Sequence, residues 1–533
     1  MQNHQLSDRL SWGDTVFLHL EREGMPLNVA SVFIFEGKIS LADCMQFVES
    51  KLPLLPRYLK RVIAAPLGLG LPSWEYDPGF DLHRHVREKT LKHGTESELK
   101  RFAGKLFSEV MDRTHPLWDI TLVHGLRENH TALVLRLHHC MADGIAGVKI
   151  INVLLDASPA APRLPKRKIK FTVPPPPSPL NSLTGGVVDS YSDLVQRILT
   201  AIADLLNMGE RAFNGGQFLP AEDLSKLLPE ITAFTQRLRF NVKYRGPQKF
   251  AWADIPLAEV KQIGHTFGAS VNDVILTAVT AAVRRYVEFH GDPVRGRLFR
   301  MMVPVNLRSK ESTTELGNRI SIIPVTVPLD IRDPKQLLRA VHRRTEFLKQ
   351  AHAAELVSLS VGLVGMLPSG LQAIIGPVIS QLPVTPFNLV CTNIPGPQYP
   401  LYLLGRKLLR WYPYVPVGGE MSVNCAVLSY DGNIGFGFSG DVHAAPDLTR
   451  LEDFLKVSFE ELREAAGITP PGKKSSPKRK TTRVKTRASK PLPAPEPVTN
   501  VLMSVPLTVP VPAVETVKVE PLAAEESVLA TVA

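Results

Sequence analysis

Two periods of hydrophobic spacing alternate over the first 155 residues of the chain. Residues 30–35 and 131–137 are apolar, partly β-branched runs bounded by polar residues, which predicts strands. Residues 41–52, 99–110 and 145–155 place apolar residues three or four positions apart, which predicts helices. In the last helix Ile145, Val148, Ile151 and Leu155 form one apolar face. Strands and helices that alternate in this way are typical of an α/β domain.

The same two patterns return near residue 250. They predict helices at residues 257–267, 271–288 and 451–466, and strands at residues 300–305, 320–327, 387–392, 422–430 and 434–439. Asp431-Gly432-Asn433 separates the last two strands and is a hairpin signal. Between the two regions, residues 157–181 are basic and rich in proline, which predicts a semi-rigid linker. Helical spacing also occurs at residues 187–208 and 224–238.

These patterns divide the chain into four parts. They are an N-terminal domain at residues 1–156, a linker with connecting helices at 157–245, a C-terminal domain at 246–468 and a tail at 469–533. A length of 533 residues fits two to four domains. Residues 473–490 hold nine basic residues and no acidic one, so we expect a disordered tail. Such a tail could be simply solvated or could attach to anionic lipid.

Charge and cysteine content exclude several classes of protein. The net charge is +11, but residues 471–533 hold ten basic and five acidic residues and supply +5 of it. The remaining +6 is spread over the other residues, which does not indicate a nucleic-acid binder. Four cysteines form no C-x-x-C pair, which argues against a disulfide scaffold or a zinc site and fits a reducing cytosol. The first residues lack the apolar core of a signal peptide.

Residues 356–405 contain no charged residue. Pro368, Pro377, Pro383 and Pro386 interrupt this segment, so no apolar run reaches the roughly 18–20 residues that a membrane-spanning helix needs. We expect either a buried helix with a core strand, or an apolar helix that lines a lipid tunnel or rests on a membrane surface.

The run His138-His139-Cys140-Met141-Ala142-Asp143-Gly144 directly follows the predicted strand at 131–137. Histidine is the side chain best suited to take and return a proton near neutral pH. A metal site or a satisfied pair of core histidines is the alternative, but no second cluster has metal-ligand spacing. Covalent catalysis is disfavoured because the chain has no G-x-S-x-G nucleophile elbow.

This H-H-x-x-x-D-G run resembles the acyltransferase motif of the chloramphenicol-acetyltransferase-like superfamily. Further segments resemble blocks of one group within it, the bacterial wax ester synthase/diacylglycerol acyltransferases. They are Leu-Ser-Trp-Gly-Asp at 10–14, the Pro-Leu-Trp block at 116–126, Ser-Val-Asn-Asp-Val-Ile-Leu at 270–276, Val-Pro-Val-Asn-Leu-Arg at 303–308, Leu-Gly-Asn at 316–318 and Asn-Ile-Pro-Gly-Pro at 393–397. The resemblance runs from about residue 7 to 467 and leaves out the tail, and the proline-rich linker is longer than is common.

The resemblance implies two α/β domains with mixed sheets and an active-site tunnel between them. It implies transfer of a long-chain acyl group from acyl-CoA to diacylglycerol or to a fatty alcohol, which makes triacylglycerol or wax esters. Acyl-CoA is then a substrate, and we expect no cofactor and no metal. We expect a cytoplasmic protein that contacts the inner membrane or lipid droplets peripherally and binds no nucleic acid.

The resemblance assigns His139 as the general base that takes the alcohol proton. His138 is expected to pack and to shape the turn. Asp143 is either a partner of His139 or, as in the superfamily, the partner of an arginine that holds the loop, with Arg308 and Arg319 as candidates. Gly144 is expected to permit a close approach of the backbone at the start of the next helix.

Asn272 has two interpretations. It could donate a hydrogen bond to the oxyanion of the transition state. It could instead begin a helix together with Ser270 and Asp273, because Ser, Asn and Asp are good N-caps. The Pro-Leu-Trp block at 116–118 is expected to pack in the core rather than to act in catalysis.

Two other functions remain open at this point. The chain could be an acyltransferase of the same fold with another acceptor, such as a polyketide or a carrier-bound chain. It could also be a lipid-droplet surface protein that has lost catalysis, although the intact His motif argues against this.

Overall fold

The computed structural model describes residues 9–65, 71–142, 144–160, 235–306, 320–351, 353 and 387–469. These described residues belong to one compact unit, which contains two six-stranded sheets. All structural statements below concern the described residues.

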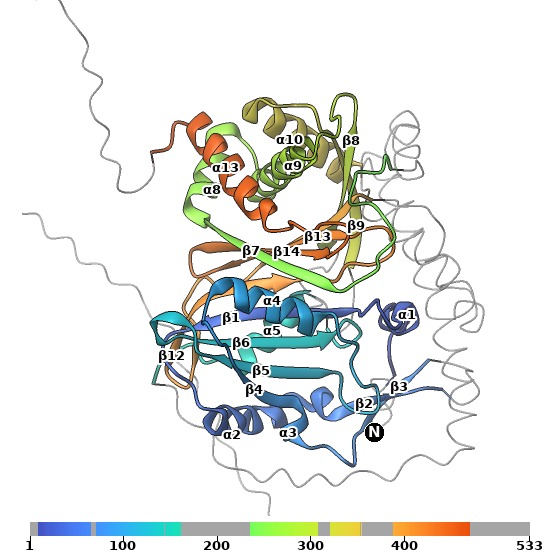
Figure 1. Cartoon of the computed structure of the whole chain (residues 1–533), viewed down its shortest axis with the longest axis vertical. Helices are drawn as coiled ribbons and strands as arrows, with labels where there is room; N and C mark the ends of the chain where they lie inside the picture. The colour runs from blue at the N-terminus through green and yellow to red at the C-terminus, as the bar shows by residue number, and fades with distance from the viewer. Residues whose placement is uncertain are drawn as a thin grey trace, which may run out of the picture. The chain divides into compact units, whose positions relative to one another are not determined.

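The first sheet has the strand order β11-β12-β1-β6-β5-β4 (Figure 1). Only β4 and β5 run parallel, so the sheet is mixed. Its strands are β1 (Asn28–Phe35), β4 (Val86–Thr90), β5 (Trp118–His124), β6 (Thr131–His138), β11 (Tyr402–Leu403) and β12 (Arg406–Tyr414). The last two strands come from the predicted C-terminal domain. The division at 246–468 is therefore wrong for this segment, which crosses over to complete the N-terminal sheet beside β1.

The second sheet has the order β7-β14-β13-β10-β8-β9 and is also mixed, because β10 runs parallel to both of its neighbours. Its strands are β7 (Gln248–Pro256), β8 (Leu298–Asn306), β9 (Ile320–Pro328), β10 (Leu389–Pro395), β13 (Val423–Tyr430) and β14 (Asn433–Asp441). The hairpin between β13 and β14 was predicted, and its turn places Asp431 and Gly432 at φ angles of 42° and 80°. Positive φ at both central residues matches the right-handed twist of the strands.

Helices cover both faces of the first sheet. α2 (Leu41–Lys51) and α5 (Gly144–Leu154) pack on one face, against the side chains of Leu133, Leu135 and Leu137. α4 (Glu96–Phe107) packs on the other face together with β7, against Ala132 and Val134. Because successive strand residues point to opposite faces, every side chain of β6 is buried. α1 (Trp12–Leu20), α3 (Leu82–His85) and a two-stranded ribbon of β2 (Lys60–Ile63) and β3 (Ser73–Tyr76) complete this half.

The second sheet carries its own core, with α8 (Leu257–Phe267), α9 (Val271–Phe289), α10 (Pro334–Gln350) and α13 (Arg450–Ala465) on one face (Figure 1). α9 is almost wholly buried. Short 3-10 turns lie at Leu52–Leu54, Pro56–Leu59 and Arg127–Asn129. None of the described helices is alone long and apolar enough to cross a bilayer; α8 and α9 reach that length only as a pair bent by 101°.

Most predicted elements are confirmed within a few residues. The helix predicted at 99–110 begins earlier, at Glu96, because Thr95 caps it. Several elements were not predicted, among them α1, α10, β4, β5, β7 and β12. Residues 235–238, at the end of the helix predicted at 224–238, are not helical. The rest of that helix, the helix at 187–208, residues 161–181 of the linker, the tail from residue 470 and most of the charge-free segment lie outside the described residues.

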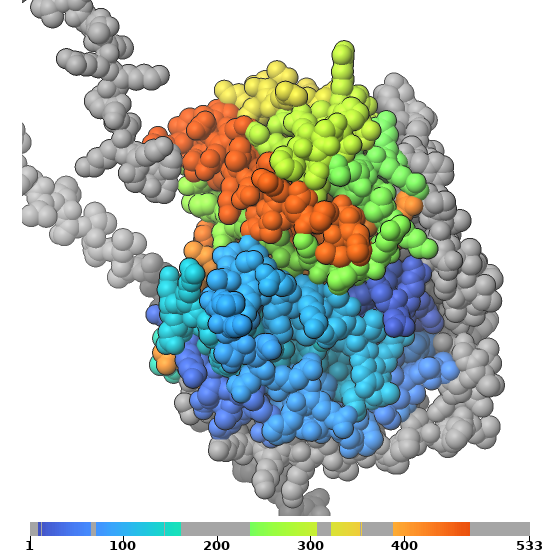
Figure 2. All heavy atoms as spheres, viewed as in Figure 1, coloured from blue at the N-terminus to red at the C-terminus, as the bar shows by residue number. Residues whose placement is uncertain are grey.

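The two halves meet where side chains are absent. A Cβ atom on Gly437 of β14 would lie 1.8 Å from the carbonyl oxygen of Pro413 in β12, and one on Gly435 would lie 2.4 Å from that of Trp411. On α4, a Cβ on Gly104 would lie 2.8 Å from the carbonyl oxygen of Gln248 in β7. Figure 2 shows α4, in blue, directly against the red residues of α13, where Lys100 Nζ lies 2.6 Å from Glu452 Oε2.

We predict that Gly437→Ala lowers the free energy of unfolding by about 2 kcal/mol or more, because the added methyl group must push two backbones apart. Chemical denaturation measures this change. Gly147→Ala is the control, since a Cβ there meets no atom within 4 Å, and alanine in a helix should be stabilising by up to about 1 kcal/mol. Equal stability of Gly437→Ala and the natural chain would show that the halves do not meet as described.

Candidate active site

The histidine pair lies at the end of β6, and its backbone is fixed on both sides. The N–H of His138 donates to the carbonyl of Leu117 at 2.9 Å, and the N–H of His139 donates to the carbonyl of Leu27 at 2.9 Å. Leu117 and Trp118 are buried, and the Trp118 indole donates to the carbonyl of Tyr58 at 2.7 Å. The Pro-Leu-Trp block thus packs in the core, as predicted. It also holds the histidine turn through the bond between the Leu117 carbonyl and the His138 N–H.

His138 is fully buried and faces a carboxylate. Its Nδ1 accepts a hydrogen bond from the Cys140 N–H at 3.1 Å. In a neutral ring the proton must then sit on Nε2, which lies 3.4 Å from Oε1 of Glu21. His138 therefore shapes the turn through Cys140 and points its N–H at Glu21.

Glu21 follows α1 and is itself held by three partners. It accepts hydrogen bonds from the Leu27 N–H at 3.0 Å and from Arg113 Nη2 at 2.9 Å, and its Oε1 lies 3.4 Å from Nε2 of His138. Burial alone would raise the pKa of this carboxyl group, but the bonds and charges of His138, Leu27 and Arg113 lower the pKa to about 2. Glu21 is therefore ionised at neutral pH, although its side chain is almost inaccessible to solvent.

His139 is half-buried and stacks on an aromatic ring. The ring of Phe17, on α1, lies 3.8 Å from the imidazole between centroids, at an interplanar angle of 10°. Burial lowers the pKa of His139 to about 4. A hydrogen bond to the backbone of His139 itself raises this pKa, and the charge of the neighbouring His138 lowers it further. The ring is neutral at physiological pH, and because Nδ1 is buried, Nε2 is the nitrogen that a substrate could meet.

A buried ion pair supports β6 two residues before the histidines. Arg136 donates to both oxygens of Asp119 in β5, at 3.0 Å through Nε and 2.5 Å through Nη2. It also donates to the carbonyls of Leu106 and Glu109 at the end of α4. The signal for this pair in the sequence is a single arginine within the otherwise apolar run at residues 131–137.

Gly144 begins α5 and touches the second half of the molecule. A Cβ atom there would lie 2.1 Å from Cδ1 of Ile394 in β10. The close approach expected at this glycine is thus present, although its partner is a side chain rather than backbone. Asp143, Arg308 and Arg319 lie outside the described residues, so the role of Asp143 stays a prediction.

Asn272 is the second residue of α9. The cap of this helix is a reciprocal pair of bonds between Ser270 and Asp273, so the capping role belongs to these two residues. Asp273 is fully buried and also binds Thr345 at 2.6 Å and His342 at 2.9 Å, both on α10. The side chain of Asn272 instead accepts from Asn393 Nδ2 at 3.2 Å. Among the described residues, no acceptor lies within hydrogen-bond distance of its own Nδ2 group.

The structure connects these predicted residues across β10. Asn393 contacts Asn272 at the start of α9, and the next residue, Ile394, contacts Gly144 at the start of α5. Phe17, Glu21, Arg113 and the Arg136–Asp119 pair were not predicted. Phe17, Glu21 and Arg113 come from other elements, and only contacts in the folded chain reveal them, whereas Arg136 lies in β6 itself.

Comparison with known proteins places the chain among acyltransferases. Residues 10–275 match the family model "Wax ester synthase/diacylglycerol acyltransferase catalytic domain", and residues 316–463 match "WS/DGAT C-terminal domain". A protein of Mycobacterium tuberculosis named probable diacylglycerol O-acyltransferase tgs1 is 30% identical over 427 residues, which cover 80% of this chain and 89% of the relative. A second protein of that organism, named probable diacylglycerol O-acyltransferase tgs2, is 26% identical over 475 residues, which cover 86% of this chain and all of the relative.

Two solved structures show the same fold. The wax ester synthase/diacylglycerol acyltransferase from Marinobacter aquaeolei VT8 is 23% identical, with a TM-score of 0.60, over 86% of this chain and 100% of that one. The first condensation domain of the calcium-dependent antibiotic synthetase is 16% identical, with a TM-score of 0.54, over 86% and 97%. The predicted chloramphenicol-acetyltransferase-like fold with mixed sheets is confirmed.

We predict that Glu21→Gln removes part of the pH dependence of stability. The folded pKa of Glu21 lies near 2, below its ordinary value of 4.5. The ionised group therefore stabilises the fold above about pH 4.5, and this contribution, on the order of 3 kcal/mol, is lost as the pH falls toward 2. Denaturation of the natural chain and of Glu21→Gln between pH 7 and pH 3 should give curves that converge at low pH. A constant difference between the curves would show that Glu21 does not titrate as described.

Proposed function

We propose, from the premise that this chain belongs to the wax ester synthase/diacylglycerol acyltransferase family, that it uses acyl-CoA as acyl donor and His139 as general base. The chain is an O-acyltransferase of the class that makes triacylglycerols and wax esters. The acceptor is then the free hydroxyl of a diacylglycerol or of a long-chain alcohol.

The observation that carries the proposal is the environment of His139: a neutral imidazole, shielded on one face by Phe17, at the turn where the two halves meet. A thioester is already activated, so no covalent enzyme intermediate is required. Nε2 takes the hydroxyl proton while the oxygen attacks the thioester carbonyl. The tetrahedral intermediate then expels the CoA thiolate, which takes the proton back from the imidazolium. One such base contributes about 10²–10⁴-fold to the rate.

Asn272 supports the same step from the second half. Its side-chain oxygen accepts from Asn393, and within the part of the chain that the structure describes its Nδ2 group has no acceptor of its own. It lies in the first turn of α9, where the helix dipole favours negative charge. We assign it to the developing oxyanion, a role worth about 3–4 kcal/mol in other enzymes. A tunnel between the halves, which would admit both substrates, remains a prediction.

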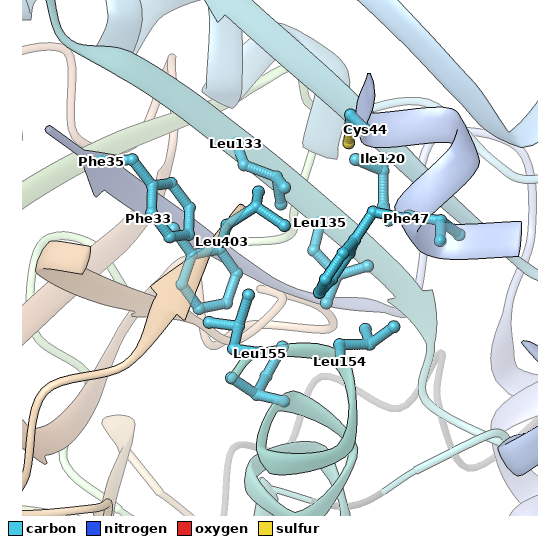
Figure 3. A pocket seen from close by; sticks show the side chains of 12 residues that line it. Phe33, Phe35, Cys44, Phe47, Ile120, Leu133, Leu135, Leu154, Leu155 and Leu403 are labelled. Carbon is cyan, nitrogen blue, oxygen red and sulfur yellow. The ribbon is translucent and has the colours of Figure 1, made fainter. Parts of the chain in front are cut away.

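A small apolar cavity, of about 20 Å³, lies in the first half of the molecule, and we propose that it widens to receive the end of the acyl chain (Figure 3). It lies between the first sheet, α2 and α5, and every residue that lines it is apolar or cysteine: Phe33, Phe35, Cys44, Phe47, Val48, Ile120, Leu133, Leu135, Ile151, Leu154, Leu155 and Leu403. β6 ends at His138 and α5 starts at Gly144, so the cavity lies between the two elements that flank the histidine turn.

The spacing along these elements gives the distance from the histidine turn to the cavity. Leu135 lies three residues before His138, about 10 Å along a strand. Leu154 lies ten residues after Gly144, about 15 Å along a helix. We propose that the acyl chain runs from the turn between β6 and α5 and ends against these side chains. A chain held there would leave the thioester at the histidine turn.

We propose that the enzyme acts in the cytoplasm at the surface of the inner membrane or of lipid droplets. Its acceptors are apolar lipids, and residues 473–490 carry nine basic residues and no acidic one. Basic residues near an anionic lipid surface contribute about 1 kcal/mol each.

We predict that the purified chain releases CoA from palmitoyl-CoA when dioleoylglycerol or hexadecanol is supplied, and that His139→Ala lowers the rate at least about 100-fold. Thiol release with each acceptor measures both. His93→Ala, which removes an exposed histidine, is the control. Undiminished activity of His139→Ala would exclude it as the base. Binding to lipid droplets without turnover in the natural chain would favour a non-catalytic surface protein, and turnover only with another hydroxyl compound would favour a different acceptor.

We predict that the size of the cavity sets acyl-chain preference. Phe47→Ala enlarges it and should shift the ratio of kcat/KM values toward longer acyl-CoAs several-fold, whereas Leu154→Phe narrows it and should shift the ratio toward shorter ones. Competition between decanoyl-, palmitoyl- and stearoyl-CoA measures the ratio. Phe289→Ala, at an exposed phenylalanine of α9, is the control. If both cavity variants fold and keep the natural ratio, the chain does not end there.

A further inference from the structure

We propose that α1, with the residue that follows it, is the positioning element of the histidine turn, with Phe17 holding the ring of His139 and Glu21 holding that of His138. This inference rests on the proposed role of His139 as base. It concerns two residues that no sequence motif marked and that lie 122 and 117 positions before their partners.

The two side chains share one face of the helix. Residues four positions apart lie above one another on a helix, so Phe17 and Glu21 both point at the turn. Phe17 stacks almost parallel on His139, with 3.8 Å between the ring centroids. Glu21 lies 3.4 Å from Nε2 of His138. Each histidine of the pair therefore has its own contact with the same short element.

α1 is fixed firmly enough to serve as a reference. Ser11 caps its first turn by accepting from the Asp14 N–H at 3.1 Å. At the other end the Glu21 N–H donates to the Phe17 carbonyl, and Arg113 Nη2 donates to the Leu18 carbonyl at 2.8 Å. Arg113 binds Glu21 through the same nitrogen, so one guanidinium group joins the helix end, the carboxylate and the segment before β5.

Stacking by Phe17 has two consequences for a base. It prevents rotation of the imidazole out of its plane, which fixes the direction of the Nε2 lone pair. It also covers one face of the ring with hydrocarbon, which excludes water and favours the neutral form. An aromatic face can still stabilise a transient imidazolium through cation–π attraction. A flat ring at this position therefore orients the base without hydrogen bonding to it.

Several charged groups surround the turn and enter its pH dependence. The neighbouring His138 disfavours protonation of His139. The buried Cys140 thiol, whose pKa is raised well above its ordinary value mainly by burial, lies within the field of Asp14, Glu21, Arg113 and Arg57. Replacing Phe17 keeps all of these charged groups and removes the aromatic ring that shields the imidazole of His139 from water.

The test compares steady-state kinetics and pH profiles of variants in the full-length chain. Phe17→Leu keeps an apolar side chain but loses the flat ring, so we expect kcat to fall at least about tenfold while KM for palmitoyl-CoA changes less than twofold. With the ring of His139 open to water, its pKa should rise from about 4 toward 6.5. A base works only when unprotonated, so the acidic limb of kcat/KM should move up in pH by one unit or more.

Matched variants separate positioning from general damage. Phe17→Tyr retains the ring and should keep the natural pH profile and kcat. Val16→Ala, at the half-buried neighbour on α1, should change neither. Glu21→Gln should lower kcat with little change in KM, since it removes the charge that holds His138. If Phe17→Leu does not fold, Phe17→Met replaces it, because its flexible side chain fills the same space without a ring.

The outcomes distinguish this inference from the proposed function. An active His139→Ala overturns the assignment of the base, and the positioning role falls with it. An inactive His139→Ala together with a folded Phe17→Leu or Phe17→Met of natural kcat and pH profile overturns the positioning role alone. A lowered kcat and a shifted acidic limb in that variant, restored in Phe17→Tyr, support it.

Discussion

The structure depends on a close contact between its two halves, in which the backbone of one strand touches the backbone of another. Gly435 and Gly437 of β14 lie directly against backbone carbonyls of β12, and any side chain there would separate the strands. β12 belongs by sequence to the second half but by hydrogen bonding to the first sheet. The crossover therefore anchors one half in the other, and the glycines allow the second sheet to close on the strand. This contact fixes the distance between the two halves. At that distance Ile394 reaches Gly144, and Asn272 approaches the half of the molecule that carries the histidines.

Three buried carboxylates fix the elements that carry the functional residues. Asp119 pairs with Arg136 on β6, Glu21 with Arg113 beside α1, and Asp273 with Thr345 and His342 at the start of α9. Burying an ion pair contributes little net stability, because desolvation offsets the attraction. Its geometry, however, is specific, and breaking it leaves an uncompensated charge. Each pair lies within four residues of a residue proposed to act on the substrate or to hold the base, so the polar groups are placed where position matters more than stability.

Periodicity predicted the local elements well and the long-range ones poorly. β6, α8 and α9 appear nearly at their predicted bounds, because their apolar spacing reflects burial within the same element. β12 was missed, and with it the crossover, because strand pairing with β1 leaves no trace in local spacing. α10 was missed because charged residues dominate it, although Leu337, Leu338, Val341 and Leu348 form a buried face. At the site, the motif and the family resemblance supplied His138, His139, Gly144 and Asn272. Phe17, Glu21 and Arg113 act through contacts more than 90 residues away in sequence, which no motif of one segment contains.

The low pKa of His139 at first argues against a base, since a ring with a pKa of about 4 holds a proton weakly. The reaction, however, needs the proton twice. Attack on the thioester occurs with proton removal, so the ring never has to generate a free alkoxide, and the negative charge that grows on the carbonyl oxygen favours the imidazolium in the transition state. In the second step of the reaction the imidazolium must protonate a thiolate, whose conjugate acid has a pKa of about 8.5. An acid with a pKa near 4 does this readily. Burial of the ring therefore makes His139 a weaker base in the attack on the thioester, which is already activated. It also makes the imidazolium a stronger acid in the step that protonates the departing thiolate.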